Sequence, residues 1–248
     1  MGVDGNGVYG DAVTKCLWCI DSTEFERARS QSLLSLSPLA FLCTPPIHRC
    51  VHPDHLLIVP IAHCAALTGL EEEPFECVRN YMKSLVAFFA SRGEAPLFLE
   101  TVPKQAEAER QMAGLGEHTE IEVLPLPAER LKEARVYFRK AFDESEGFWQ
   151  SHKTVIEAKG RQGVRAAIPK GFPYIYVDFS LEDGLAHVIE DGEEFSRSFG
   201  REVFLGILEK EKTERPFRDP RAYKSNIERL KRDYAPYDWT QAQQGDRS

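Results

Sequence analysis

The stretch EHTEIEVLPLP, Glu117 to Pro127, decides how this chain is interpreted. Polar and apolar residues alternate with a period of two through EIEVL, which predicts a β-strand and contradicts a helix. Alternate side chains of a strand share a face, so one face would carry His118, Glu120 and Glu122. One imidazole and two carboxylates in a row fit three interpretations: a metal site, an acid–base pair, or a solvated face beside an apolar core.

The composition of the whole chain narrows its class. Its 248 residues are 42% apolar and 28% charged, which fits one large globular domain or two small ones. No apolar run approaches the roughly 20 residues that a membrane helix needs. Residues 1–14 lack the basic flank and apolar stretch of a secretory signal, so we expect a flexible lead on an intracellular chain. The six cysteines are then expected to be reduced or metal-bound.

Charge is unevenly distributed along the sequence. The formal net charge of −8 argues against a surface that attracts polyanions everywhere. Residues 197–232 nevertheless carry eleven Lys and Arg against six Asp and Glu. This segment is either the solvated face of a helix or a local contact for phosphates.

The pattern of elements predicts an α+β protein and not a doubly wound parallel sheet. Hydrophobic periodicity places strands at 55–60, 96–102, 119–126, 173–181 and 184–191. It places helices at 74–92, at 128–145, at 196–212, and from 221 to a stop at Pro236. We expect a boundary between two halves near residues 127–150, and a polar tail at 241–248.

The sequence CLWC places Cys16 and Cys19 at a spacing that lets both thiolates hold one tetrahedral zinc ion. A reduced, structural or redox pair is the rival interpretation. Zinc needs two more ligands, and His63 and His118, at the ends of two predicted strands, could converge on one edge. A second combination is offered by the loop IHRCVHPD, in which His48, Cys50 and His52 lie close together.

Two of these segments together resemble the signature of the histidine-triad superfamily. PDHLLIVPIAH (53–63) is similar to its first motif, with Asp54 in place of the usual glycine, and HTEIEVLP (118–125) occupies the place of the second. Zinc-bearing branches of that superfamily hold the metal with a Cys-x-x-Cys pair, the histidine that closes the first motif and the first triad histidine. The resemblance therefore implies one structural zinc ion bound by Cys16, Cys19, His63 and His118.

Only the first histidine of the triad is present, and Glu120 and Glu122 stand where the other two would be. In the hydrolases of the superfamily the middle histidine is the nucleophile that forms a nucleotidyl intermediate. A carboxylate is a weaker nucleophile there and repels the phosphate that it must approach. We therefore expect an acidic pocket and a pseudoenzyme without catalytic residues. A nucleotidyl hydrolase with an altered site remains the alternative.

The second half extends and sharpens the resemblance. The blocks FLET, VLPLP, YFRKAFDESEGFW, IPKGFPYIYVDF, HVIED and PYDW are similar, in this order, to the C-terminal region of CwfJ-type spliceosome-associated proteins. The similarity covers residues 14–240. It implies a histidine-triad-like antiparallel sheet with helices and a zinc site at 15–127, followed by a smaller α+β domain of the CwfJ C-terminal type at 128–240.

The same resemblance implies a function. CwfJ-type proteins are associated with late spliceosomes that contain the excised intron lariat, and with lariat turnover. We expect a nuclear, non-catalytic splicing factor, present in a single copy within a complex and without membrane contact. Its expected partners are spliceosomal proteins and branched intron lariat RNA, with snRNA as a further candidate.

Residues for an RNA contact can be named from charge and aromatic content. The candidates are Lys170, beside Phe172, Tyr174 and Tyr176, and a basic cluster of Arg229, Lys231 and Arg232. Lys and Arg on phosphates with bases stacked on aromatic rings is the usual pattern for single-stranded RNA. A scaffold that binds only proteins, with its basic segment docked on an acidic partner, is the third hypothesis.

Overall fold

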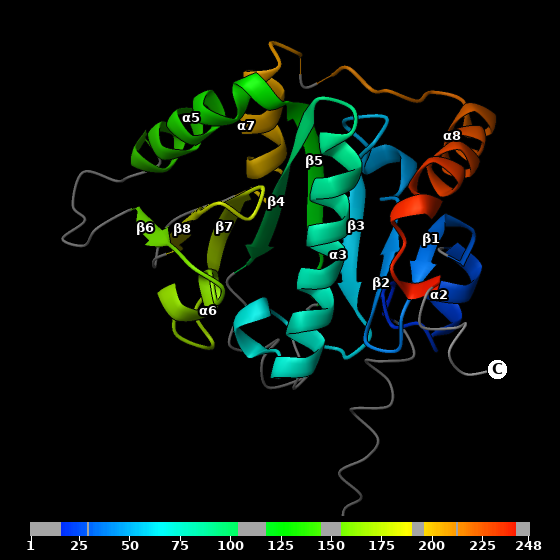
Figure 1. Ribbon diagram of the computed structural model, residues 1–248, viewed down its shortest axis with the longest axis horizontal. Helices are drawn as coiled ribbons and strands as arrows, with labels where there is room; N and C mark the ends of the chain where they lie inside the picture. The colour runs from blue at the N-terminus through cyan, green and yellow to red at the C-terminus, as the bar shows by residue number, and fades with distance from the viewer. Residues whose placement is uncertain are drawn as a thin grey trace, which may run out of the picture.

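The computed structural model describes residues 16–28, 30–103, 118–144, 155–189, 196–211 and 213–241. The predicted lead at 1–14 and residues 242–248 of the predicted tail lie outside these ranges. The described chain forms one eight-stranded sheet in the order β1-β2-β3-β5-β4-β7-β8-β6, and every neighbouring pair is antiparallel (Figure 1). The predicted α+β class is therefore confirmed.

The strands are β1 (Leu33–Leu36), β2 (Ala40–Cys43), β3 (Leu56–Pro60), β4 (Glu94–Val102), β5 (Ile121–Pro127), β6 (Ile156–Ala158), β7 (Tyr174–Phe179) and β8 (Gly184–Val188). The α-helices are α2 (Thr23–Ala28), α3 (Glu72–Ala90), α5 (Leu131–Glu144), α6 (Val164–Ala167), α7 (Phe199–Ile207) and α8 (Pro220–Tyr234). Single 3₁₀ turns lie at η1 (Ser30–Ser32), η2 (Ile47–Arg49), η3 (Leu67–Gly69), η4 (Ala128–Arg130) and η5 (Ala235–Tyr237).

All five predicted strands and all four predicted helices are present, although their ends differ from the predicted ones. The largest difference is α7, which ends at Ile207 although apolar periodicity predicts a helix to residue 212. The backbone turns there because Glu209 adopts a φ of 55°, which a helix does not allow. Three short strands were not predicted: β1, β2 and β6 have four, four and three residues, too few for alternation to be recognised.

Helix α3 covers one face of the sheet, as Figure 1 shows. Its apolar stripe is buried, as its periodicity predicts: Phe75, Val78, Met82, Leu85 and Phe89. This stripe packs on side chains of β3, β4 and β5, among them Ile58, Phe98 and Val123. The helix stops before Gly93, which takes the left-handed φ of 71° that glycine adopts most easily.

The opposite face is covered by two groups of side chains. Helices α5 and α7 bury Phe138, Phe142 and Phe204 against β4, β5, β7 and β8. Farther along the sheet, Trp18 and Phe25 pack on β2 and β3. The segment that carries Cys16 and Cys19 is thereby fixed against the back of β2 and β3.

The sheet connects the two predicted halves of the chain. Strand β4 pairs with β7 over six residue pairs, from Leu97 opposite Phe179 to Val102 opposite Tyr174. Helix α8 then returns to the first half, where Leu230 and Tyr234 join the core beneath α3. The division into units at 15–127 and 128–240 stays a prediction, and any such units share this sheet.

Candidate metal centre

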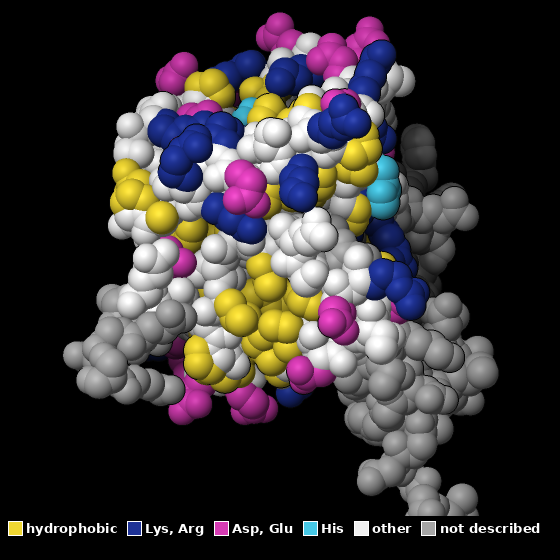
Figure 2. All heavy atoms as spheres, turned by 90° about the vertical axis from the view of Figure 1, so that its right-hand side faces the viewer, with side chains coloured by type: hydrophobic (Ala, Val, Ile, Leu, Met, Phe, Trp, Pro, Cys, Tyr) yellow, Lys and Arg dark blue, Asp and Glu magenta, His cyan; other side chains and the backbone are white. Residues whose placement is uncertain are grey.

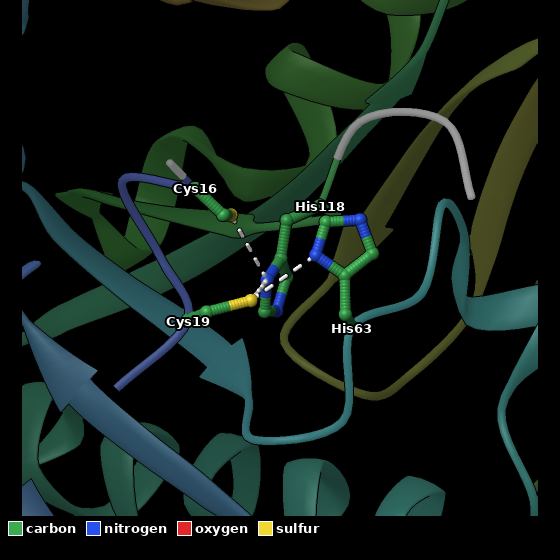
Figure 3. A group of neighbouring side chains, drawn as sticks. All are labelled: Cys16, Cys19, His63 and His118. Carbon is green, nitrogen blue, oxygen red and sulfur yellow. Dashed lines mark hydrogen bonds between the residues drawn. The ribbon is translucent and has the colours of Figure 1, made fainter. Parts of the chain in front are cut away.

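Four side chains from three segments converge beside the end of β3 (Figure 3). Cys16 and Cys19 come from the segment before α2, His63 from the loop after β3, and His118 from the segment that leads into β5. All four were named from the sequence, and the structure brings them together. One ligand atom from each residue lies within 4.8 Å of those of the other three.

The distances between the ligand atoms suit a tetrahedral metal ion. The Nδ1 atom of His118 lies 3.6 Å from the Sγ atoms of Cys16 and of Cys19, and the Nδ1 atom of His63 lies 3.1 Å from Sγ of Cys19. Metal bonds of about 2.1 to 2.3 Å in a tetrahedron separate neighbouring ligand atoms by roughly 3.4 to 3.8 Å. Both distances of His118 fall within this range, and the distance between His63 and Cys19 is somewhat shorter. The two sulfurs and two nitrogens form a donor set that zinc prefers.

The orientation of His118 also fits a ligand. Its Nε2 atom donates to the carbonyl oxygen of Pro60 over 2.8 Å, which leaves Nδ1 free to bind a metal. The backbone N–H of Trp18 donates to Sγ of Cys16 over 3.4 Å, which favours the thiolate. The backbone of β3 and the segment before α2 thus preorganise two of the four donors.

The two cysteines have unequal acidities. Burial raises the pKa of Cys16, but hydrogen bonds with His118 and His63 outweigh it and lower that pKa to about 5. Burial and the neighbouring Cys16 raise the pKa of Cys19 to about 12. The protein environment by itself favours one thiolate, so a bound cation is what would stabilise the second.

The alternative set in the loop IHRCVHPD does not assemble into such a cluster. Among the described residues, the only group of three or more potential donors that could hold a metal ion is the one just described. His52 accepts a hydrogen bond from the backbone N–H of Asp54 and lies edge-on to Phe204. Burial lowers the pKa of His52 to about 4, so its ring is neutral near pH 7.

The two glutamates at the remaining triad positions are neutralised by arginines. Arg49, from η2, donates to Oε1 of Glu120 and, over 3.0 Å, to Oε1 of Glu122. Arg201, from α7, donates to the same oxygen of Glu122 over 2.5 Å. The predicted acidic pocket is therefore corrected: this face is charge-compensated because cations from two distant segments reach the carboxylates.

Burial and ion pairing have opposite effects on the pKa values of these two carboxyl groups, and the balance differs between them. Burial would raise the pKa of Glu122, but His55, whose Nε2 lies 3.4 Å from Oε2 of Glu122, and the charges of Arg201 and Arg49 hold that pKa well below its usual range. For Glu120, burial prevails over Arg49 and raises the pKa. Glu122 is thus a fixed anion within an ion-pair network, which disfavours a role as a nucleophile.

A cavity of about 590 Å³ adjoins both features. Its walls include the ligand candidates Cys16, His63 and His118, and also the network of Glu120, Glu122, Arg49 and Arg201. The arginines were not singled out from the sequence. Two half-buried carboxylates on one face need cations, but nothing in the local sequence indicates which arginines supply them.

The residues predicted to contact RNA do not form one surface. Lys170 is exposed in the turn before β7, whereas Arg229, Lys231 and Arg232 lie on α8, which contacts β1 at the far edge of the sheet. Tyr174 and Tyr176 are buried, with 0% and 5% of their surfaces exposed, so they offer no base-stacking face. Phe172 is 49% exposed, so its ring remains available for stacking against a base.

Arg229 is committed to an internal ion pair. It donates to Asp54, which is 3% exposed and also accepts from Arg92, and it pairs with Asp233 over 3.2 Å. Arg232 is exposed, and Lys231 is half-buried. Two further cations of α8, Arg221 and Lys224, are also exposed, and neither was named from the sequence as an RNA contact.

Figure 2 shows the side of the molecule that lies on the right in Figure 1, where α8 is found. Lys and Arg side chains gather over the upper part of this side, above a hydrophobic patch.

None of the described helices combines the length and the apolar character needed to cross a bilayer.

Two family models match the chain. One, described as "Protein similar to CwfJ C-terminal", matches residues 9–139, and the other, "Protein similar to CwfJ C-terminus 2", matches residues 148–240.

Several proteins of known name are similar over most of this chain. CWF19-like protein 2 of Homo sapiens is 34% identical over 239 residues, which cover 92% of this chain and 24% of the human protein. The CWF19-like protein 2 homolog of Caenorhabditis elegans is 32% identical over 93% of this chain and 48% of its own length. The pre-mRNA-splicing factor cwf19 of Schizosaccharomyces pombe is 29% identical over 78% of this chain and 30% of its own length.

The chain thus spans between about a quarter and a half of these relatives. One of them, that of Schizosaccharomyces pombe, is named as a pre-mRNA-splicing factor. On the evidence of both family models, which together cover all eight strands of the described sheet, this chain belongs to the CwfJ family.

Proposed function

We propose that this chain is a non-catalytic pre-mRNA splicing factor of late or intron-lariat spliceosomes, where it contacts branched intron RNA and neighbouring splicing proteins. The proposal includes a nuclear location, a single copy within the complex and a role in lariat turnover. It is carried by the membership in the CwfJ family, whose relatives include a protein named as a pre-mRNA-splicing factor.

The ion-pair network supports the non-catalytic part. In a histidine-triad-like arrangement, Glu120 and Glu122 occupy the positions of the second and third histidines. Glu120, at the position of the nucleophile, is bound by Arg49, and Glu122 is bound by both Arg49 and Arg201. A nucleophile must be free to approach its substrate, which a carboxylate held in an ion pair is not.

A structural zinc ion bound by Cys16, Cys19, His63 and His118 completes the proposal. With four protein ligands the ion would have no open position, as in structural sites that contribute to folding. Such an ion would tie the segment before α2 to the loop after β3 and to the start of β5. It would neutralise the second thiolate that burial otherwise disfavours.

The exposed face of α8 is the best surface for RNA. Arg221, Lys224 and Arg232 are exposed along it, and Arg215 and Arg218 precede the helix. Glu228 is the one acidic residue exposed on the same stretch of helix, and it pairs with Lys231 over 3.3 Å. An exposed pair of this kind contributes little to stability, so Lys231 can exchange Glu228 for a phosphate.

The deciding experiment compares equilibrium binding of the zinc-loaded chain to a 2′–5′ branched RNA and to its linear counterpart over a series of salt concentrations. We expect a preference for the branched form that persists as salt rises, because recognition of shape does not depend on counterion release. Equal and strongly salt-dependent binding of both RNAs contradicts recognition of the branch. No binding at all favours the scaffold that contacts only proteins.

One observation keeps the hydrolase alternative open to test, namely the cavity of about 590 Å³ that Glu120 lines. Release of nucleoside monophosphate from a nucleotide substrate, abolished by Glu120→Gln, would establish an altered catalytic site and overturn the non-catalytic assignment. We expect no release by either protein.

A further inference from the structure

Glu100 is a buried carboxyl group at the centre of the sheet that the proposed function has not used. It lies on β4, with 1% of its surface exposed. Its surroundings supply three hydrogen-bond donors. Oε1 accepts from the backbone N–H of Leu67 and from the hydroxyl of Thr119, each over 2.7 Å, and Oε2 accepts from the hydroxyl of Tyr174 over 2.5 Å.

Two of these donors belong to the segments that carry the histidine ligands. Thr119 follows His118 directly, and Leu67 lies four residues after His63, at the start of η3. The two segments also bind each other, since the backbone N–H of Thr119 donates to the carbonyl of Cys64 over 2.7 Å. One carboxyl oxygen therefore fixes both histidine-bearing segments to β4.

The third donor comes from the other half of the chain. Tyr174 lies on β7, is fully buried, and belongs to the segment matched by the second family model. The residues that would hold the metal all lie in the segment matched by the first model. Glu100 thus links a side chain of the second matched segment to the metal centre of the first.

We propose that Glu100 is a positioning residue of the metal centre and that Tyr174, through Glu100, makes metal affinity depend on the second half of the chain. This inference rests on the proposed zinc site. Partners that orient ligand segments commonly change metal affinity about 10- to 100-fold when they are removed. Without the carboxyl group, the Leu67 N–H and two hydroxyls would be buried without an acceptor, and both histidine segments would lack their common anchor.

A matched pair of tyrosines separates positioning from general stability. Tyr176 lies on the same strand as Tyr174, is also buried, and donates to another buried carboxyl group, that of Asp178, over 2.9 Å. Asp178 otherwise accepts from the backbone N–H of Leu181, in the turn between β7 and β8. Neither contact involves a segment with a metal ligand. Tyr174→Phe and Tyr176→Phe each remove one hydroxyl from the same strand.

The experiment measures Zn²⁺ affinity of the full chain by competition with a chromophoric chelator, and the visible spectrum of the Co²⁺-substituted protein. We expect Tyr174→Phe to lower Zn²⁺ affinity about 10-fold and to alter the Co²⁺ spectrum, whereas Tyr176→Phe leaves both as in the wild type. Glu100→Ala should lower Zn²⁺ affinity about 100-fold, and Glu100→Gln, which keeps an oxygen for Leu67 and Thr119, should stay within about 3-fold of the wild type.

Equal Zn²⁺ affinities and Co²⁺ spectra for Tyr174→Phe and Tyr176→Phe would overturn the inference while leaving the zinc site intact. The tyrosine pair gives this answer even if Glu100→Ala fails to fold. A wild-type chain that binds neither ion would instead overturn the metal assignment itself, so the two failures are distinguishable.

Discussion

His118 and Glu120 are two positions apart in the sequence, yet the residues around them give the two side chains different roles. The ring of His118 is oriented by the carbonyl of Pro60 toward the sulfurs of Cys16 and Cys19. The carboxylate of Glu120 is drawn to Arg49. The imidazole and the two carboxylates on this face therefore belong to different features. His118 belongs to the candidate metal centre, whereas Glu120 and Glu122 belong to an ion-pair network.

The metal assignment makes a prediction for single cysteines. Cys19→Ser should reduce the zinc content from one ion per chain to a small fraction and lower the thermal midpoint, because metal binding contributes to folding. Cys77→Ser is the control, since Cys77 is a buried cysteine of α3 whose sulfur contacts Ser37 and no ligand candidate. Atomic absorption and calorimetry measure the two effects. Full zinc content in Cys19→Ser would remove that residue from the site.

Glu100 predicts a pH dependence of stability. Burial raises its pKa from 4.5 to about 7, although three hydrogen bonds oppose the shift. Between these values the folded state keeps the proton that the unfolded state has released, so this group makes the free energy of unfolding fall as pH rises from about 4.5 to about 7. The total fall is on the order of 3 kcal/mol.

Glu100→Gln should abolish that fall. Denaturant unfolding at saturating zinc, at several pH values between 4.5 and 7.5, gives the difference in unfolding free energy between the wild type and the variant. The variant should gain stability relative to the wild type as pH rises. A difference that is constant over this range would show that Glu100 has the same pKa in both states.

At the scale of elements, α8 has an inner side that holds it in place and an outer side available to a partner. Ile227, Leu230 and Tyr234 are buried, and Asp219 caps the first turn by accepting from the N–H of Arg221. Arg229 reaches Asp54, and Asn226 donates to the carbonyl of Pro53 over 2.7 Å. These contacts fix the rotation of the helix and thereby determine which of its cations face outward.

The two sides should respond differently to mutation. Reversing Arg221, Lys224 and Arg232 to Glu should weaken RNA binding and reduce the slope of log affinity against log salt by about 0.7 for each phosphate that is no longer neutralised. The thermal midpoint should change little, because all three are exposed. Titrations at several salt concentrations and a melting curve test this. An unchanged salt slope would exclude the outer face of α8 from the RNA site.

Arg229→Ala should show the converse behaviour. It removes one of two cations from the buried Asp54, which should cost about 1 to 3 kcal/mol of stability, while Arg92 keeps the carboxylate partly compensated. With the variant fully folded at low temperature, RNA affinity should remain close to that of the wild type. A large drop in affinity with unchanged stability would return Arg229 to the set of RNA-binding residues.

At the scale of the whole molecule, the sheet makes the two matched segments interdependent. A chain ending at Glu144 would keep α5 but lack β7, which covers the edge of β4, and α8, which covers part of the α3 core. An uncovered strand edge beside exposed apolar surface favours aggregation. We expect this truncated chain to be insoluble or to show no cooperative unfolding transition, and co-expression with residues 145–248 to restore a soluble complex. Cooperative unfolding of the truncated chain alone would make the first segment an independent domain.

The sequence by itself determined those features of the protein that depend on residues close together in the chain. The period of two in EIEVL, the helical spacing of the apolar residues in α3, and the two-residue gap between Cys16 and Cys19 are local patterns with local physical causes. The α+β class follows from the order of such elements. The places of His63 and His118 at strand ends made them candidate ligands, and resemblance to known families, also readable from the sequence, selected them for the metal set and pointed to splicing.

Only the tertiary structure decided which distant residues meet. Arg49 and Glu122 are 73 positions apart, Glu100 and Tyr174 are 74 apart, and Asp54 and Arg229 are 175 apart. No periodicity spans such separations, so the sequence predicted an acidic pocket where the structure shows a compensated one. It also assigned Arg229 to RNA although its charge is used internally. A side chain's charge can be read from the sequence, but whether it is neutralised depends on packing, because burial makes a distant partner necessary without determining its place in the chain.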